Sequence, residues 1–225
     1  MLDVYLIHGL YLNRAVMVPL AQRLRAQGHR VHLVGHSTVW GSLARNAEDV
    51  RACIERTRPQ GRCVVIGHSL GGVVATFAAN RHPDLPISDI MLLGSPYHGS
   101  AAARALAARP GGGHLIGRPL LEWLSLRNFE APRHVRLWTL IGDRALGVGQ
   151  YIGRFAEQPN DGTVAVDEAT IAEAHDTATL PVSHMQMLVS GPVAAQVLAW
   201  LARIEAGDTG MAGSGDQLQK VGGQG

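Results

Sequence analysis

One serine in this sequence stands in a pattern that suits nucleophilic chemistry. Residues 64–66 are Val-Val-Ile, residues 67–72 read Gly-His-Ser-Leu-Gly-Gly, and an apolar helical segment follows. A strand, Gly-x-Ser-x-Gly and a helix in that order predict a sharp turn that strains the backbone of the serine and exposes its hydroxyl. Ser69 is therefore the candidate nucleophile. Ser37 shares the Gly-His-Ser triplet but lacks the second glycine and a following helix, so we interpret it as a loop residue near the pocket rim.

A serine hydroxyl needs partners before it can act as a nucleophile. A base must take its proton, and a carboxylate must hold that base in the right tautomer. Eleven histidines are available as bases. Among the acidic residues, Asp143 directly follows Trp-Thr-Leu-Ile-Gly and so ends an expected strand, which makes it a geometrically plausible acid. We assign no proton-transfer role to His68 or His98, and we expect the His68 side chain to point away from the reaction.

Short apolar runs alternate with helix-period segments along the chain, which is typical of βα units that feed a parallel sheet. The fold class is thus α/β, with a doubly wound, mostly parallel six-stranded sheet flanked by helices. We expect strands at 4–7, 30–34, 63–66, 89–93, 135–141 and 177–180, and helices at 16–27, 43–57, 70–81, 115–129 and 192–204.

The domain organisation follows from where this alternation stops. Residues 1–206 are expected to form one domain. Residues 207–225 are rich in Gly, Ser and Gln and lack apolar periodicity, so we expect a disordered tail.

Charge and hydropathy exclude several classes of partner. The net charge is only +2, and the arginines are scattered singly, so nucleic-acid binding is not expected. No apolar run approaches the ~20 residues that span a bilayer, and Met1 is not followed by a basic, then apolar leader. We therefore expect a cytoplasmic protein without stable membrane insertion.

Four segments together resemble the α/β-hydrolase superfamily of serine esterases and lipases, especially the minimal bacterial lipases without a large cap domain. They occur in the family's order of nucleophile, acid and histidine. The segments are His-Gly-Leu at 8–10, the serine motif at 67–72, Gly-Ser-Pro-Tyr-His-Gly-Ser at 94–100, and Asn-Asp-Gly at 160–162 followed by His184.

The resemblance implies roles for five residues. Its base corresponds to His184, between the last strand and the last helix. Its acid corresponds to Asp161 in the Asn-Asp-Gly motif, 23 residues before His184, with Asp143 as the alternative acid. An oxyanion hole needs two aligned N–H donors, and by position these are the backbone amides of Leu10 and Leu70. An Asx-type turn is a structural alternative for Asp161.

The implied activity is hydrolysis of a carboxylic ester through an acyl-enzyme on Ser69, without a metal or organic cofactor. An acyltransferase, thioesterase or amidase would use the same residues, and a non-catalytic binding protein on this scaffold is a further alternative. About forty residues separate the fourth and fifth expected strands, longer than an ordinary connection. The segment 101–133 is therefore a possible lid that lines a pocket for an apolar acyl chain, or a crossover helix on the sheet. The oligomeric state stays open.

Overall fold

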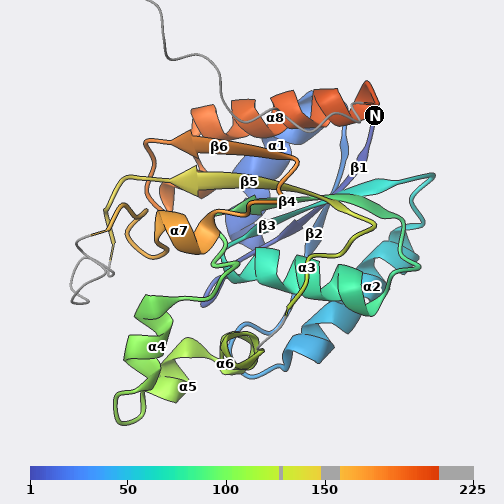
Figure 1. Ribbon diagram of the computed structural model, residues 1–225. Coiled ribbons are helices and arrows are strands. Elements are labelled where there is room, and N and C mark those ends of the chain that lie inside the picture. Colours follow the sequence, from blue (N-terminus) through green and yellow to red (C-terminus); the bar gives the residue numbers. More distant parts are fainter. Residues whose placement is uncertain (127–128, 148–157, 208–225) are drawn as a thin grey trace, which may run out of the picture.

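Six strands form one parallel sheet at the centre of the protein (Figure 1). The computed structural model describes residues 1–126, 129–147 and 158–207. The sheet order is β2-β1-β3-β4-β5-β6, and every neighbouring pair is parallel, which confirms the predicted α/β fold class. The strands are β1 (Asp3–Ile7), β2 (Arg30–Val34), β3 (Cys63–His68), β4 (Ile87–Leu93), β5 (Arg136–Gly142) and β6 (Asp176–Leu180).

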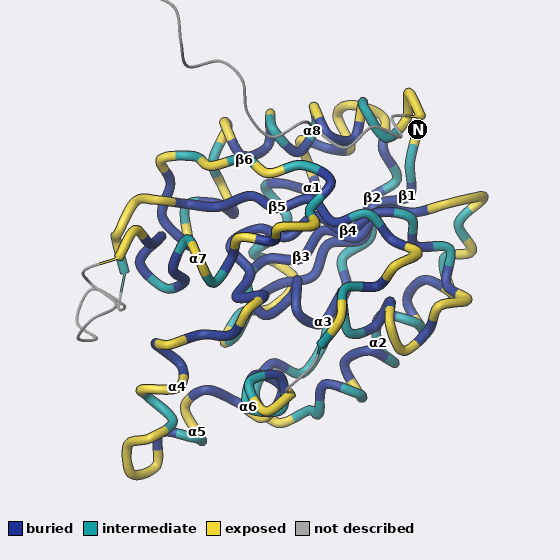
Figure 2. The backbone as a smooth tube through the Cα atoms, viewed as in Figure 1, coloured by how far each residue is buried: buried dark blue, intermediate teal, exposed yellow. Residues whose placement is uncertain are grey.

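Helices cover both faces of this sheet because the central strands are apolar on both sides. Along β1, Val4 and Leu6 belong to one buried cluster, and Tyr5 and Ile7 belong to the other. Successive side chains of a strand point to opposite faces, so each face supplies one core. The first cluster packs under α1 (Val18–Ala26) and α8 (Gly191–Glu205), and the second under α2 (Leu43–Thr57) and α3 (Leu70–Arg81). Figure 1 shows these two pairs of helices on opposite faces of the sheet, and Figure 2 shows that the central strands are buried.

The order of the strands determines where a cleft can form. After β1 the chain adds β2 on one side and then returns to add β3 on the other side. In parallel sheets a crevice opens at the carboxyl ends of the strands where the chain reverses direction in this way. Residues 8–10 after β1 and Ser69 after β3 both lie at this point.

The helices between β4 and β5 differ from the sequence prediction. A single helix over 115–129 was expected, but the structure has α4 (Ala101–Ala107), α5 (Gly112–Ile116) and α6 (Arg118–Ser125). Gly117 separates the last two with φ at 73°, which ends one helix, and Pro119 lies in the first turn of the next. That prediction was wrong because helical spacing of apolar residues continues across the break.

Smaller differences occur elsewhere. Arg14–Met17 form a 3-10 turn before α1, where a continuous helix from 16 was expected, and the short α7 (Val166–Ala169) was not anticipated. The expected tail lies, apart from Gly207, outside the described residues. The disorder of that tail and the single domain over 1–206 stay predictions.

Candidate active site

Ser69 occupies the turn between β3 and α3 with φ at 55° and ψ at −122°. L residues rarely adopt this backbone conformation, because it brings their Cβ atom against neighbouring backbone atoms. The Ser69 N–H donates to the carbonyl oxygen of Leu93 at 2.9 Å, so the end of β4 holds the turn. The side chain remains partly exposed at the carboxyl end of β3.

Close backbone packing explains the glycines around this turn. A Cβ atom on Gly67 would lie 2.3 Å from a backbone nitrogen of α3, and one on Gly71 would lie 2.3 Å from the carbonyl oxygen of Ile7. A Cβ atom on Gly9 would lie 3.1 Å from the Cβ atom of Ser69. The start of α3 therefore touches the end of β1, and residues 8–10 are brought beside Ser69.

A buried carboxylate and imidazole face each other at the same edge of the sheet. His184 Nδ1 lies 2.6 Å from Asp161 Oδ2, and the side chains are almost fully buried. The other carboxylate oxygen accepts the N–H groups of Thr163 and Val164 at 2.9 and 2.7 Å. The His184 N–H also donates to the carbonyl oxygen of Asp161 at 2.8 Å. Asp161 thus forms an Asx-type turn and holds the His184 ring as well.

Asp143, the alternative acid, lies at the end of β5 as expected, but its side chain is exposed. Its backbone N–H donates to the carbonyl oxygen of Leu180 at 3.2 Å, which continues the pairing of β5 with β6. The carboxylate that reaches His184 belongs to Asp161 instead. The carboxylate that contacts the candidate base therefore comes from the loop 160–165 and not from the end of β5.

His68 differs from expectation. Its ring centroid lies 4.6 Å from that of His184, and its Nε2 lies 3.0 Å from the His184 carbonyl oxygen. The expectation that this side chain points away from the reaction was wrong, because it packs against the candidate base. Since a carbonyl only accepts, Nε2 carries the proton. Burial, reinforced by the nearby His184, lowers the His68 pKa to about 3, so the ring is neutral at pH 7.

Two backbone amides border Ser69 at the positions expected for oxyanion donors. Leu70 is the first residue of α3, where an N–H has no partner inside the helix. Leu10 lies in the turn after β1, which the Leu12 N–H closes onto the Gly9 carbonyl oxygen at 3.3 Å. Neither the Leu10 nor the Leu70 N–H donates to another described residue. Both are therefore available to an anionic oxygen.

Two histidines to which the sequence analysis gave no individual role, His8 and His36, stabilise the turn after β1. The His36 Nε2 donates to the His8 carbonyl oxygen at 2.9 Å, and the two rings stack with centroids 4.4 Å apart. Burial lowers the pKa of both residues, to about 4 for His36, so they pack as neutral rings. Ser37 accepts the Gly41 N–H at 2.8 Å, which fits its interpretation as a loop residue. In the sequence, the second Gly-His-Ser triplet at 35–37 is the feature that drew attention to the loop of His36 and Ser37.

A cavity of about 420 Å³ connects these groups. Its polar lining consists of hydroxyl and imidazole groups, and none of its described lining residues is Asp, Glu, Lys or Arg. The polar side chains are those of His68, Ser69, Ser100, Thr163, His184 and Tyr11. The remaining lining is mostly apolar and comes from Leu10, Leu12, Leu70, Pro96, Ala102, Ala103, Leu106, Leu115, Ile116, Leu120, Leu146, Val164 and Met185.

The predicted lid segment contributes much of this wall. α4, α5 and α6 lie together below α3 in Figure 1, apart from the sheet. Residues of all three helices line the cavity, including Ala103, Leu115 and Leu120. The segment thus contributes residues to the cavity wall, and its role as a lid stays a prediction.

Membrane-spanning helices and metal-binding clusters are both absent from the described residues. No helix there is long and apolar enough to cross a membrane. In the same residues, no group of three or more His, Cys, Asp or Glu side chains could hold a metal ion.

Comparisons with known proteins agree with this architecture. The chain is 34% identical over 112 residues to a 2-(acetamidomethylene)succinate hydrolase of Mesorhizobium japonicum. The aligned region covers 47% of this chain and 40% of that protein. It is 37% identical over 98 residues to a pyrethroid hydrolase of Sphingobium wenxiniae, covering 36% of this chain and 32% of that protein. The chain thus spans less than half of the length of either relative.

Structural similarity extends over more of the chain. The mature lipase BlEst2 of Bacillus licheniformis superposes with a TM-score of 0.68 at 18% identity, covering 88% of this chain and 91% of the lipase. At that identity the likeness shows a shared fold. A sequence profile of the alpha/beta hydrolase family matches residues 4–214. With the parallel sheet and the serine turn after β3, this match means that the chain belongs to the alpha/beta hydrolase family.

Proposed function

We propose that this protein hydrolyses carboxylic esters, with Ser69 as nucleophile, His184 as general base and Asp161 as the acid that orients the base. One observation carries the proposal: a strained serine and His184, whose Nδ1 lies 2.6 Å from the buried Asp161 Oδ2, line the same mostly apolar cavity. The relatives support bond hydrolysis in general, since two are named hydrolases and the structural neighbour is named a lipase.

The chemistry follows from the positions of these groups. Ser69 Oγ adds to the ester carbonyl carbon while His184 Nε2 takes the hydroxyl proton. The tetrahedral intermediate collapses, the C–O bond to the alcohol breaks, and His184 returns the proton to the departing alcohol. Water then attacks the acyl-enzyme with His184 again as base, releasing the carboxylic acid and restoring Ser69. Asp161 stabilises the imidazolium that forms in each half-reaction.

The negative charge of each tetrahedral intermediate needs donors that are fixed before the reaction. The Leu10 and Leu70 N–H groups serve in this role. Both lie beside Ser69, and neither donates to an acceptor among the described residues. Their effect arises mainly in the transition state, where the oxygen becomes anionic. Gly9 permits the close approach that brings the Leu10 amide to the serine.

The cavity favours a neutral, apolar acyl group. Its 420 Å³ would hold about a dozen methylene-sized groups, taking ~30 Å³ for each as for a water molecule. A carboxylate in the acyl group would meet no lysine or arginine among the described lining residues. Burying such an unpaired charge is costly. We therefore expect medium-length, uncharged acyl chains as substrates.

A p-nitrophenyl ester series from acetate to palmitate tests the proposal. Wild type should turn over medium-chain esters best, and Ser69→Ala should lose activity by at least about 10³-fold. Ser37→Ala is the matched control, because Ser37 lies in the other Gly-His-Ser triplet and only holds its own loop. It should keep wild-type activity. An inactive wild type, or an active Ser69→Ala, would exclude ester hydrolysis through Ser69.

A further inference from the structure

Tyr11, directly after Leu10, has an unusual backbone. Its φ is 58°, and only Arg58 and Ser69 among the other described non-glycine residues have a positive φ. Leu10 and Tyr11 are the two central residues of the turn that the Leu12 N–H closes onto the Gly9 carbonyl. A turn with positive φ only at its second central residue normally carries Gly or Asn there, because a Cβ atom is unfavourable. A tyrosine therefore needs another interaction to stay in this conformation.

That interaction comes from the helices over the cavity. The Tyr11 hydroxyl donates to the carbonyl oxygen of Leu115, in α5, although the tyrosine side chain is otherwise largely exposed. Gly111 and Gly117 flank α5 with φ at 74° and 73°. Arg118, just after α5, donates its N–H to the Val39 carbonyl oxygen at 2.8 Å. The chain just after α5, three residues beyond the acceptor of the Tyr11 hydroxyl, is thus hydrogen-bonded to the loop after β2.

Loss of this hydrogen bond would act on the proposed oxyanion hole. If Tyr11 moved to a negative φ, the Leu10–Tyr11 peptide would rotate by about half a turn, as between turn types II and I. The Leu10 carbonyl and the Tyr11 N–H would exchange directions immediately beside the Leu10 amide. A single hydrogen bond and a left-handed backbone differ little in energy, so one can balance the other.

We propose that Tyr11 is a positioning residue, whose hydroxyl holds the turn through Leu115 and so fixes the orientation of the Leu10–Tyr11 peptide directly beside the Leu10 N–H of the oxyanion hole. This inference rests on the proposed ester hydrolysis at Ser69. It assigns to α5 a part in catalysis besides lining the cavity. The residue acts through the backbone of Leu10 and not by touching the reacting atoms.

Three substitutions at this position separate the hydroxyl, the ring and the backbone. Tyr11→Phe removes only the hydroxyl, Tyr11→Ala removes hydroxyl and ring, and Tyr11→Gly also removes the Cβ atom that opposes positive φ. Tyr97→Phe is the matched control, because the buried Tyr97 hydroxyl has no hydrogen-bond partner among the described residues and does not line the cavity. Kinetics are measured with p-nitrophenyl acetate, whose short acyl group makes little use of the cavity, and thermal unfolding verifies that each variant folds.

The expected result is a change in kcat with little change in KM, since the oxyanion exists only during the reaction. For Tyr11→Phe and Tyr11→Ala we expect kcat to fall about tenfold, less than the roughly 100-fold or greater loss when a donor is removed outright. Tyr11→Gly should recover kcat to within about threefold of wild type, because glycine adopts the turn without the hydroxyl. Tyr97→Phe should match wild type.

Three outcomes overturn the inference: wild-type kcat in Tyr11→Phe, equal losses in Tyr11→Gly and Tyr11→Ala, or a defect confined to KM. The Ser69→Ala variant in the same assay separates this failure from that of the proposed function. If Ser69→Ala is inactive while the Tyr11 variants behave as wild type, only the role of Tyr11 fails. If wild type hydrolyses no ester, both proposals fall together.

Discussion

Asp161 was the acid that the resemblance implied and Asp143 the alternative, and the folded structure brings only the Asp161 carboxylate to His184. Asp143 sits where a strand ends, but its side chain is exposed, whereas the loop 160–165 carries Asp161 to His184. Asp161→Asn should lower kcat about 10³- to 10⁴-fold, because an amide holds the imidazole in the wrong tautomer. Asp143→Asn, the matched control, should stay within about twofold of wild type. Equal losses in the two variants, measured on one ester, would contradict the assignment of Asp161.

The neutral His68 beside His184 makes stability depend on pH. Burial, with the nearby His184, lowers its pKa from 6.5 to about 3, so between these values the unfolded chain binds a proton that the folded protein does not. This contribution is fully present above pH 6.5 and is lost as pH falls towards 3. From pH 7 to pH 5 we expect it to cost about 1–2 kcal/mol of the free energy of unfolding.

Urea unfolding at pH 7 and pH 5 measures this contribution. His68→Gln removes the titrating ring and keeps an N–H donor for the His184 carbonyl, so its free energy of unfolding should fall less than that of wild type. His134→Gln provides the control, because that side chain is exposed. Equal losses between pH 7 and pH 5 in wild type and His68→Gln would rule out a buried neutral His68 as the source.

At the scale of elements, the serine turn depends on contact between α3 and β1. A Cβ atom on Gly71 would lie 2.3 Å from the Ile7 carbonyl oxygen, and neither backbone can move without separating helix and sheet. Gly71→Ala should therefore lower the free energy of unfolding by about 2–3 kcal/mol and reduce kcat, because the Leu70 N–H moves with α3. Gly61→Ala is the control, since a Cβ atom there meets nothing within 4 Å. Urea unfolding that finds the two variants equally stable would refute the close packing.

The helices and strands also show how much of the fold could be predicted from the sequence. The strands and the helices on the sheet were foreseen because apolar runs of β-branched residues and helical spacing are local signals. The division of the segment between β4 and β5 into separate helices was not foreseen. The apolar residues of α5 and α6 keep helical spacing across Gly117, and only the folded structure shows that its φ is 73°. His68 was misplaced for a related reason, since the direction of a side chain in a strained turn depends on contacts with a segment 116 residues away.

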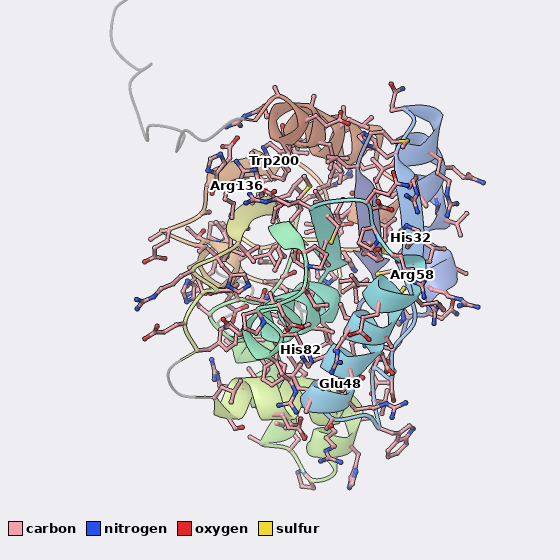
Figure 3. The ribbon with its side chains drawn as sticks, turned by 90° about the vertical axis from the view of Figure 1, so that its right-hand side faces the viewer. His32, Glu48, Arg58, His82, Arg136 and Trp200 are labelled. Carbon is pink, nitrogen blue, oxygen red and sulfur yellow. The ribbon has the colours of Figure 1, made fainter. Side chains whose placement is uncertain are left out.

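At the scale of the whole molecule, a buried ion pair and an aromatic cluster stabilise the sheet at a distance from the cleft. Asp89 of β4 is fully buried opposite Arg136 of β5, and its carboxylate accepts from Arg136 Nε and from Trp138 Nε1, each at 2.8 Å. Arg136 and Trp200, both labelled in Figure 3, pack against the ring of Trp138. These residues tie two strands and α8 together towards the amino-terminal half of β4. Ser69 follows the carboxyl end of β3 instead.

This separation means that stability and catalysis can be perturbed independently. Asp89→Asn keeps the shape of the side chain but removes the buried negative charge that the Arg136 guanidinium contacts, so we expect the free energy of unfolding to fall by about 2–4 kcal/mol. Glu130→Gln is the control, since the Glu130–Arg133 pair is exposed and should leave stability unchanged. The folded fraction of Asp89→Asn, titrated at Ser69 with a fluorophosphonate, should retain wild-type kcat. A lower kcat per titrated site would show instead that the Asp89 cluster reaches the active site through the sheet, and that the fold and the chemistry are coupled.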